Sequence, residues 1–398
     1  MGRFLNTVAG TIVCLSTLGV ASAQNNPTPD RPYEAELLSD VATRPSMTGT
    51  AGSGHDGAGF FIAGDKGFRL NIGGDIQTRY TANFGSDPTG DDNDFEGGFS
   101  TNLARLRLSG EANGFDFMLT GAFRNESDFA LEDAYAGHSF GGGRVQFGQF
   151  QLPFLRENGM DDRFLLATDE SITSSIFGQG YSQGVQGSWD VGSVRLIGAF
   201  SDGFSTANTD FNSDVEQDLA LTFRAEWTAM GERGVFNDFT SLRGSGTSLL
   251  FGAAGHFEDG DDGRMYTYTG DASFESGGFN AFAAAVGRTI EEDAGSEFND
   301  WGAVGQAGYR ITENIEFFGR YDGISPDEDR GLEDYYSFAT AGVNYYMAGH
   351  AAKFTANVVY SFENTTGFEA MNDFGNTGLL GSSDEGEIAV VGQVQILF

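Results

Sequence analysis

The chain has 398 residues, and 57 Asp and Glu against 22 Lys and Arg give it a formal net charge of -35. This acidity argues against nucleic acid as a partner, because binding to phosphates needs clustered Lys and Arg. Glycine (59 residues) and phenylalanine (37 residues) are abundant, which suits close strand packing and an apolar band edged by aromatic side chains.

The first 23 residues are typical of a secretory signal peptide. Arg3 precedes an apolar run from Val8 to Val20, and Ala21-Ser22-Ala23 supplies the small residues of a cleavage site. The single cysteine, Cys14, lies inside this run. The sequence therefore predicts a mature protein without disulfides or thiolate chemistry.

Residues 24–59 are polar and are expected to form a periplasmic leader, partly disordered, with a short helical candidate at 33–41. Residues 60–63, followed by a turn at 65–67, have the pattern of a small hairpin that leads into a long strand. We expect residues 60–398 to form a single domain after this leader.

From residue 68 to residue 84, apolar and polar side chains alternate. Leu70, Ile72 and Ile76 share one face, whereas Arg69 and Arg79 share the other. A strand of a soluble β-sandwich has on the order of six residues, and this one is more than twice as long. The pattern favours the wall of a transmembrane barrel, with one face toward lipid and one toward water.

The same pattern recurs to the end of the chain and predicts an all-β fold, a transmembrane antiparallel β-barrel of about 16 strands. Short turns alternate with long loops, except that connection 125–128 is short on the loop side and 230–247 is long on the turn side. The second exception is expected to hold a helical piece with Phe236 and Phe239. Strands are expected near residues 68–84, 101–112, 115–125, 129–138, 144–152, 181–189, 194–202, 217–229, 248–258, 264–274, 279–288, 300–310, 315–322, 335–346, 352–362 and 386–398.

Acidic residues gather in the long loops 84–100, 289–299 and 323–334. The simpler interpretation is a solvated, self-repelling surface. The alternative is that divalent cations bridge these loops to one another or to acidic surface lipids. Residues 258–263 resemble a calcium loop only loosely and lack its twelfth-position Glu, so we predict no metal site and no cofactor.

Basic residues, in contrast, fall on the polar faces of the strands. A charge on the lipid face costs about 2–4 kcal/mol at the bilayer midplane, so these side chains should point inward. Two interpretations stay open: a basic wall that favours anions, or arginines that pair across strands with inward acids and brace the wall. The basic residues predicted to line a pore are Arg69, Arg79, Arg105, Arg107, Arg124, Arg144, Arg224, Arg310, Arg320 and Lys353.

The chain ends on a strand, Ile388 to Phe398, that has one wholly apolar face and a terminal aromatic residue. This ending resembles that of bacterial outer-membrane proteins, in which the last strand closes a barrel and the barrel-assembly machinery reads the tail. We expect this strand to pair with residues 68–84, in a protein that resides in the outer membrane and contacts its lipids.

Two segments resemble the phosphate-selective porin O and P family. One joins Asp133-Ala134-Tyr135 to residues 143–154, which contain Gly148-Gln149-Phe150 and end in Pro153-Phe154. The other is residues 350–360, with His350 and Lys353 ahead of an apolar run. The resemblance implies a channel of sixteen strands, usually a homotrimer, with one long loop folded inward to narrow the pore.

That loop would be residues 153–180. Opposed acids and arginines in it would create a transverse field that orients polar solutes. Its candidate constriction residues are Arg156, Glu157, Asp161, Asp162 and Arg163.

These features predict a porin, an outer-membrane channel for passive diffusion of small polar or charged solutes, including anions such as phosphate. The alternative is a structural or adhesive barrel that its loops plug. An enzyme is not expected, because the histidines lie far apart and outside the motifs that join a nucleophile to a base. They are His55, His138, His256 and His350.

Overall fold

The computed structural model describes residues 52–55, 59–64, 67–85, 95–124, 128–213, 216–261, 263–365, 368, 371, 374, 376–381 and 386–398. The predicted signal peptide, the predicted leader as far as residue 51, and most of loop 84–100 lie outside these residues. In the described part of the chain, no helix is both long enough and apolar enough to cross a bilayer.

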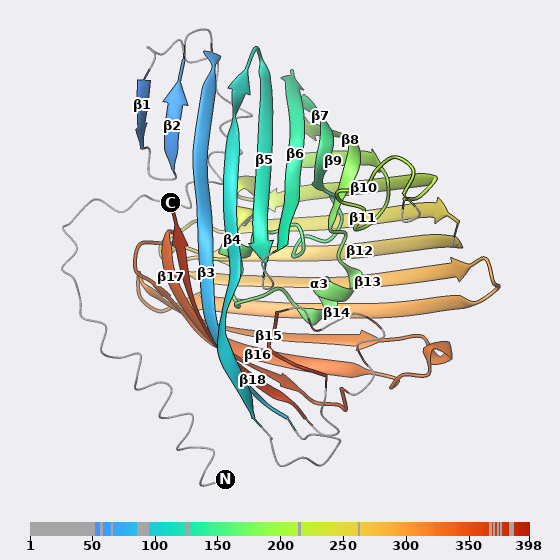
Figure 1. Ribbon diagram of the computed structural model, residues 1–398. Coiled ribbons are helices and arrows are strands. Elements are labelled where there is room, and N and C mark those ends of the chain that lie inside the picture. Colours follow the sequence, from blue (N-terminus) through green and yellow to red (C-terminus); the bar gives the residue numbers. More distant parts are fainter. Residues whose placement is uncertain are drawn as a thin grey trace. The chain divides into compact units, whose positions relative to one another are not determined.

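Sixteen strands, β3 to β18, form a closed antiparallel barrel in which each strand pairs with its neighbours in sequence (Figure 1). The seam between β18 and β3 runs from Ile388 opposite Phe84 to Leu397 opposite Asp75. The strands are β3 (Arg69–Phe84), β4 (Glu96–Ala112), β5 (Phe115–Arg124), β6 (Asp128–Phe140), β7 (Gly143–Gln151), β8 (Tyr181–Val191), β9 (Val194–Ser201), β10 (Leu219–Met230), β11 (Ser248–Gly260), β12 (Gly263–Ser276), β13 (Phe279–Glu292), β14 (Glu297–Arg310), β15 (Ile315–Ser325), β16 (Tyr336–Tyr346), β17 (Ala352–Ser361) and β18 (Ile388–Leu397).

The two faces of the barrel wall differ as the period-two alternation predicts. In β3, Asp75, Gln77 and Arg79 are buried on the inner face, whereas Ile76 between them is 43% exposed on the outer face. Large apolar side chains such as Phe147 and Trp301 are likewise exposed on the outside. Such a surface is suited to lipid, since a soluble protein rarely exposes so much contiguous apolar area.

Each predicted strand has a counterpart in the structure, and the all-β barrel is confirmed. Several strands extend beyond their predicted ends, most clearly β4, which begins at Glu96 because Asn83 of β3 still pairs with it there. A register shift between Thr120 and Gly121 marks a bulge where β5 meets β6.

Two short strands lie outside the ring. β2 (Phe60–Ala63) pairs with β3 from Ile72 to Arg69, and β1 (Gly52–His55) pairs with β2. β1 thus lies in the segment predicted as a leader. β3 has this edge available because its pairing with β18 stops at Asp75, so β2 continues along the same edge (Figure 1).

The chain end completes the seam. Phe398 and Gly74 exchange backbone hydrogen bonds of 2.9 and 3.0 Å, and the Phe398 ring lies on the side of Gly74 where a Cβ would point. A Cβ at Gly74 would lie 2.7 Å from Phe398 Cζ and 2.3 Å from the Arg105 carbonyl oxygen. The close approach of three strands therefore requires glycine here.

We predict that Gly74→Ala destabilises the barrel at its seam. Overpacking of this kind costs about 1–3 kcal/mol. The measurement is urea unfolding in detergent micelles, followed by the heat-dependent gel mobility of the folded barrel. The control is Gly305→Ala, because a Cβ at Gly305 meets no atom within 4 Å; equal stability of the two variants would contradict the prediction.

Candidate functional site

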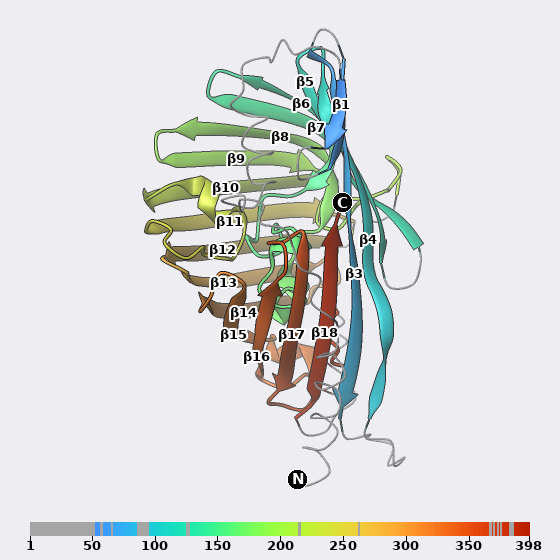
Figure 2. The same cartoon turned by 90° about the vertical axis from the view of Figure 1, so that its left-hand side faces the viewer.

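The connection between β7 and β8 lies inside the ring of strands. This inward segment, residues 152–180, contains η2 (Asp162–Phe164) and α3 (Ile172–Phe177), and α3 lies within the barrel in both views (Figures 1 and 2). The inward folding expected from the resemblance is therefore present in the structure.

Cationic side chains of the wall hold the inward segment by its backbone. Donors in five strands reach carbonyl oxygens of the segment, at 2.9 to 3.1 Å. The pairs are Arg79 with Thr168, Arg224 with Phe154, Arg288 with Ile176, Arg320 with Asp169 and Lys353 with Leu165. These bonds satisfy carbonyls that have no partners in a helix or sheet.

One sector of the barrel interior is apolar. In α3, Ile172, Ile176 and Phe177 belong to a buried cluster with inward residues of β13 and β15–β17, such as Phe338. Leu165 and Leu166 belong to a second cluster, with Phe282, Val304 and Phe318 of β13–β15. The inward segment thus packs against the wall in this sector and fills it.

A cavity of about 760 Å³ lies in the opposite sector, between the inward segment and inward residues of β3–β10. Its lining mixes both charge signs with neutral groups. The strand residues that line the cavity include Arg105, Arg107, Asp116, Arg124, Asp133, Tyr135, Gln186, Arg224 and Glu226. Water and solutes therefore have space along this wall.

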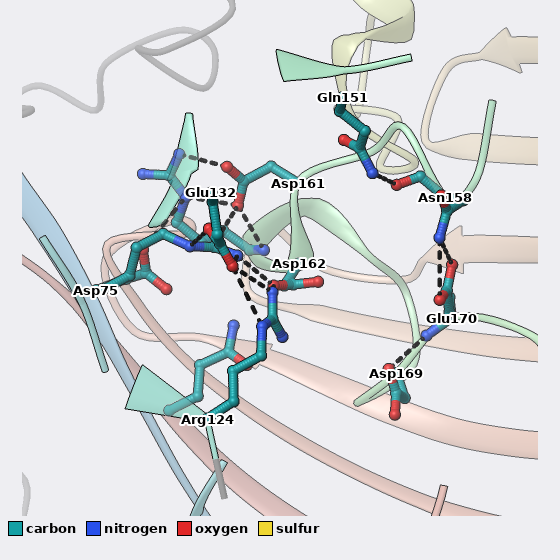
Figure 3. A network of polar contacts seen from close by, with 12 residues as sticks. Asp75, Arg124, Glu132, Gln151, Asn158, Asp161, Asp162, Asp169 and Glu170 are labelled. Carbon is teal, nitrogen blue, oxygen red and sulfur yellow. Dashed lines mark hydrogen bonds and ion pairs between the residues drawn. The ribbon is translucent and has the colours of Figure 1, made fainter. Parts of the chain in front are cut away.

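A cluster of ion pairs, here called the charge cluster, joins η2 to β3–β6 (Figure 3). Arg105 bonds to Glu132 at 2.6 Å and to Asp162 at 2.8 Å. Arg124 bonds to the same two carboxylates at 2.8 and 3.0 Å. The members are Asp75, Arg105, Arg107, Arg124, Glu132, Asp161, Asp162 and Arg163. Four arginines and four carboxyl groups give the cluster a formal net charge of zero.

Asp162 stays ionised, and the charge cluster faces the cavity. Burial would raise the pKa of Asp162, but Arg124 and Arg105 outweigh it and hold the pKa well below its usual range. The side chains of Asp161, Asp162 and Arg124 keep 26%, 27% and 39% of their surface exposed. Both signs of charge therefore meet the solvent at one level of the barrel.

The predicted site residues separate into two groups. All five candidates of the inward segment line the cavity, together with Arg105, Arg107, Arg124 and Arg224 of the wall. The other wall candidates lie outside its lining. Arg79, Arg320 and Lys353 hold the inward segment; Arg69 bonds Asn71, Arg144 pairs with Asp116 and Arg310 stacks on Tyr346.

Glu132 is the main site residue absent from the prediction. It lies where the bulge beside β5 breaks the alternation of β6, so that Glu132 and Asp133 follow one another along a strand without a regular change of face. Two adjacent acids inside an otherwise alternating strand were the available signal of that irregularity.

His256 is buried and bonds two side chains. His256 bonds Thr222 at 2.8 Å and Glu258 at 2.9 Å, which is the order of a hydroxyl, a base and a carboxylate. Thr222, however, is fully buried, and Phe204 stacks on the imidazole at 3.7 Å. No group of three or more potential metal ligands occurs among the described residues.

We predict that the double substitution Asp161→Asn and Asp162→Asn loosens the inward segment. Arg105 is buried, and removal of a buried ionic partner costs about 3–5 kcal/mol of unfolding free energy. Urea unfolding measures this loss. The control is Asp259→Asn, whose exposed pair with Arg264 should matter by less than about 1 kcal/mol; a comparable loss in both would contradict the prediction.

We predict a pH dependence of stability from Glu170. Burial, with Asp169 beside it, raises the pKa of Glu170 to about 8, although Asn158 donates to both carboxylate oxygens. The unfolded chain loses this proton near pH 4.5, so the folded state binds more protons between pH 4.5 and about 8. Stability should fall as pH rises through that range.

The measurement compares the urea midpoints of the wild type and Glu170→Gln at both ends of the range. The variant cannot ionise, so its midpoint should decline less as the pH rises. Parallel curves for the two proteins would show that Glu170 does not titrate in this way.

Solved structures of known proteins resemble the barrel described above, whereas sequence comparisons find no relative. No family model matches the chain, and no curated protein matches its sequence. The chain is similar to an anion-selective porin from Comamonas acidovorans, at 14% identity and a TM-score of 0.60, over 83% of this chain and 99% of that chain.

It is also similar to OmpT of Vibrio cholerae in a trimer form, at 10% identity and a TM-score of 0.58, over 84% of this chain and all of that one. A third similar structure is the outer membrane channel DcaP of Acinetobacter baumannii, at 15% identity and a TM-score of 0.54, over 85% of this chain and all of that one. At these identities the likeness shows the fold, and the resemblance to the phosphate-selective family stays a prediction. The chain thus has the fold of a sixteen-stranded porin barrel.

Proposed function

We propose that this protein is an outer-membrane channel for the passive diffusion of small polar solutes. The observation that supports it most directly is the cavity between the inward segment and the β3–β10 wall, with charged side chains exposed to it inside a closed barrel. Such a channel selects by width and wall charge and carries out no chemical step.

Selection by charge should be weak. The arginines at the cavity are paired with carboxylates. Within the charge cluster these are Arg105, Arg107, Arg124 and Arg163. Outside it, Arg156 pairs with Glu226, and Arg224 pairs with Glu226 and Asp271. This arrangement favours the bracing interpretation of the sequence. A neutral cluster with both signs exposed produces a transverse field rather than a net attraction for anions. We therefore propose small dipolar or charged solutes, phosphate among them, without a dedicated phosphate site.

A loop-plugged barrel is the second candidate function. The observation in its favour is the apolar sector, which the inward segment fills with buried side chains. The two candidates differ in whether the remaining cavity is continuous from one end of the barrel to the other.

Location and assembly follow from the same proposal. The apolar outer surface supports contact with outer-membrane lipids, and the closing strand with Phe398 supports recognition by the barrel-assembly machinery after secretion with a cleaved signal peptide. We also propose a homotrimer, because one similar structure is described as a trimer form. Gel mobility of the unheated protein tests the trimer.

Planar-bilayer recording under a salt gradient tests the channel. We expect stable conductance steps and a reversal potential close to zero. Arg124→Gln removes the most exposed cation of the charge cluster, so it should shift the reversal potential toward cation selectivity. The control is Arg264→Gln, an exposed residue outside the cavity lining. Absence of conductance steps from folded wild type would overturn the channel in favour of the plug.

A further inference from the structure

The connection between β10 and β11, residues 231–247, enters the barrel from the end opposite to the inward segment. The chain crosses the wall three times, in β8, β9 and β10, between the two connections, so they leave from opposite ends. The connection includes η3 (Arg233–Asn237), the helical piece predicted there. Phe236, Asp238, Phe239 and Thr240 are buried, whereas connecting loops usually run over the surface.

The two segments contact each other inside the ring. The Phe239 N–H donates to the Phe164 carbonyl oxygen at 3.3 Å, and both rings belong to the same buried cluster as Phe282 and Phe318. The Arg156 guanidinium donates to the Phe236 carbonyl oxygen and lies 5.7 Å from the centre of the Phe236 ring. Polar and apolar contacts thus join residues that are about eighty positions apart.

The β10–β11 connection is also fastened around the rim of the barrel. Arg233 pairs with Asp190 of β8, and Arg243 donates to the Ile311 carbonyl oxygen after β14. Gly277 donates to the Ser245 carbonyl oxygen at 3.2 Å, which adds the β12–β13 turn. The connection therefore contacts the rim of the barrel from β8 to β14, and not only the two strands that it joins.

One side of the connection borders the cavity. Phe236 and Asn237 line it, next to Arg156 and Glu226, whose ion pair measures 3.8 Å. Asn237 is exposed, although the residues on both sides of it in sequence are buried. A long turn that only linked two strands would have no need of buried aromatic residues or of contacts with the inward segment.

We infer that the β10–β11 connection is a second constriction element of the channel. It narrows the path from the end opposite to the inward segment, and through Phe236 it positions Arg156 at the path. The solute is therefore selected between two segments that enter from opposite ends, and not by the inward segment alone. The inference rests on the proposed channel function.

Single cysteine substitutions can test whether the β10–β11 connection borders the channel. The only native cysteine, Cys14, lies in the predicted signal peptide and should not interfere. Asn237→Cys is compared with Gly246→Cys, which lies in the same connection, is exposed, and is outside the cavity lining. A Cβ at Gly246 meets no atom within 4 Å, so that variant should fold. A charged methanethiosulfonate reagent is added during bilayer recording, and mass spectrometry verifies modification.

We expect a stepwise loss of conductance in modified Asn237→Cys and no change in modified Gly246→Cys. Asn237→Trp, which adds bulk without a reagent, should lower conductance relative to Gly246→Trp. Wild-type conductance in fully modified Asn237→Cys would overturn the inference while leaving the channel intact. Absence of conductance in the unmodified wild type would overturn the channel and this inference together.

Discussion

The interior of this barrel depends on one constraint: an irregular segment inside a ring of strands must find hydrogen-bond donors for its carbonyl groups. Inward arginines and a lysine supply them, from strands spread around the ring. Since these cations hold the segment, part of the basic wall has a structural role. The polar character of the cavity depends instead on the charge cluster, where residues of both signs are exposed.

The strands were predictable because the side chains of each strand face lipid and interior in turn. This alternation is visible in the sequence without any knowledge of contacts between distant residues. The outer parts of β4, β13 and β14 were not, because Glu96, Glu292 and Glu297 lie beyond the apolar band and lose the periodic signal. β1 was likewise missed, since Gly52–His55 has a pairing partner but no apolar face to reveal it.

The sequence predicted which face of the wall the site arginines occupy, but not which residues they bond. Strand parity placed Arg105 and Arg320 on the inner face, where both are buried. Parity cannot show that Arg105 meets Asp162 of the inward segment, or that Arg320 reaches a carbonyl, because those partners lie far away in sequence. Strand parity also could not distinguish the apolar sector of the interior from the sector with the cavity. Phe282 and Phe318 point inward and pack against the inward segment, and parity does not reveal that contact.

The seam between β3 and β18 also affects when the barrel can close during folding. Gln77 and Gln395 bond across it although they are 318 positions apart, so the ring cannot close before the last strand is available. Gln395 in addition donates to the Arg163 carbonyl oxygen at 3.4 Å, so the last strand also contacts the inward segment. A topology with such high contact order folds slowly, and its unclosed strand edges stay open to misassembly until β18 is in place.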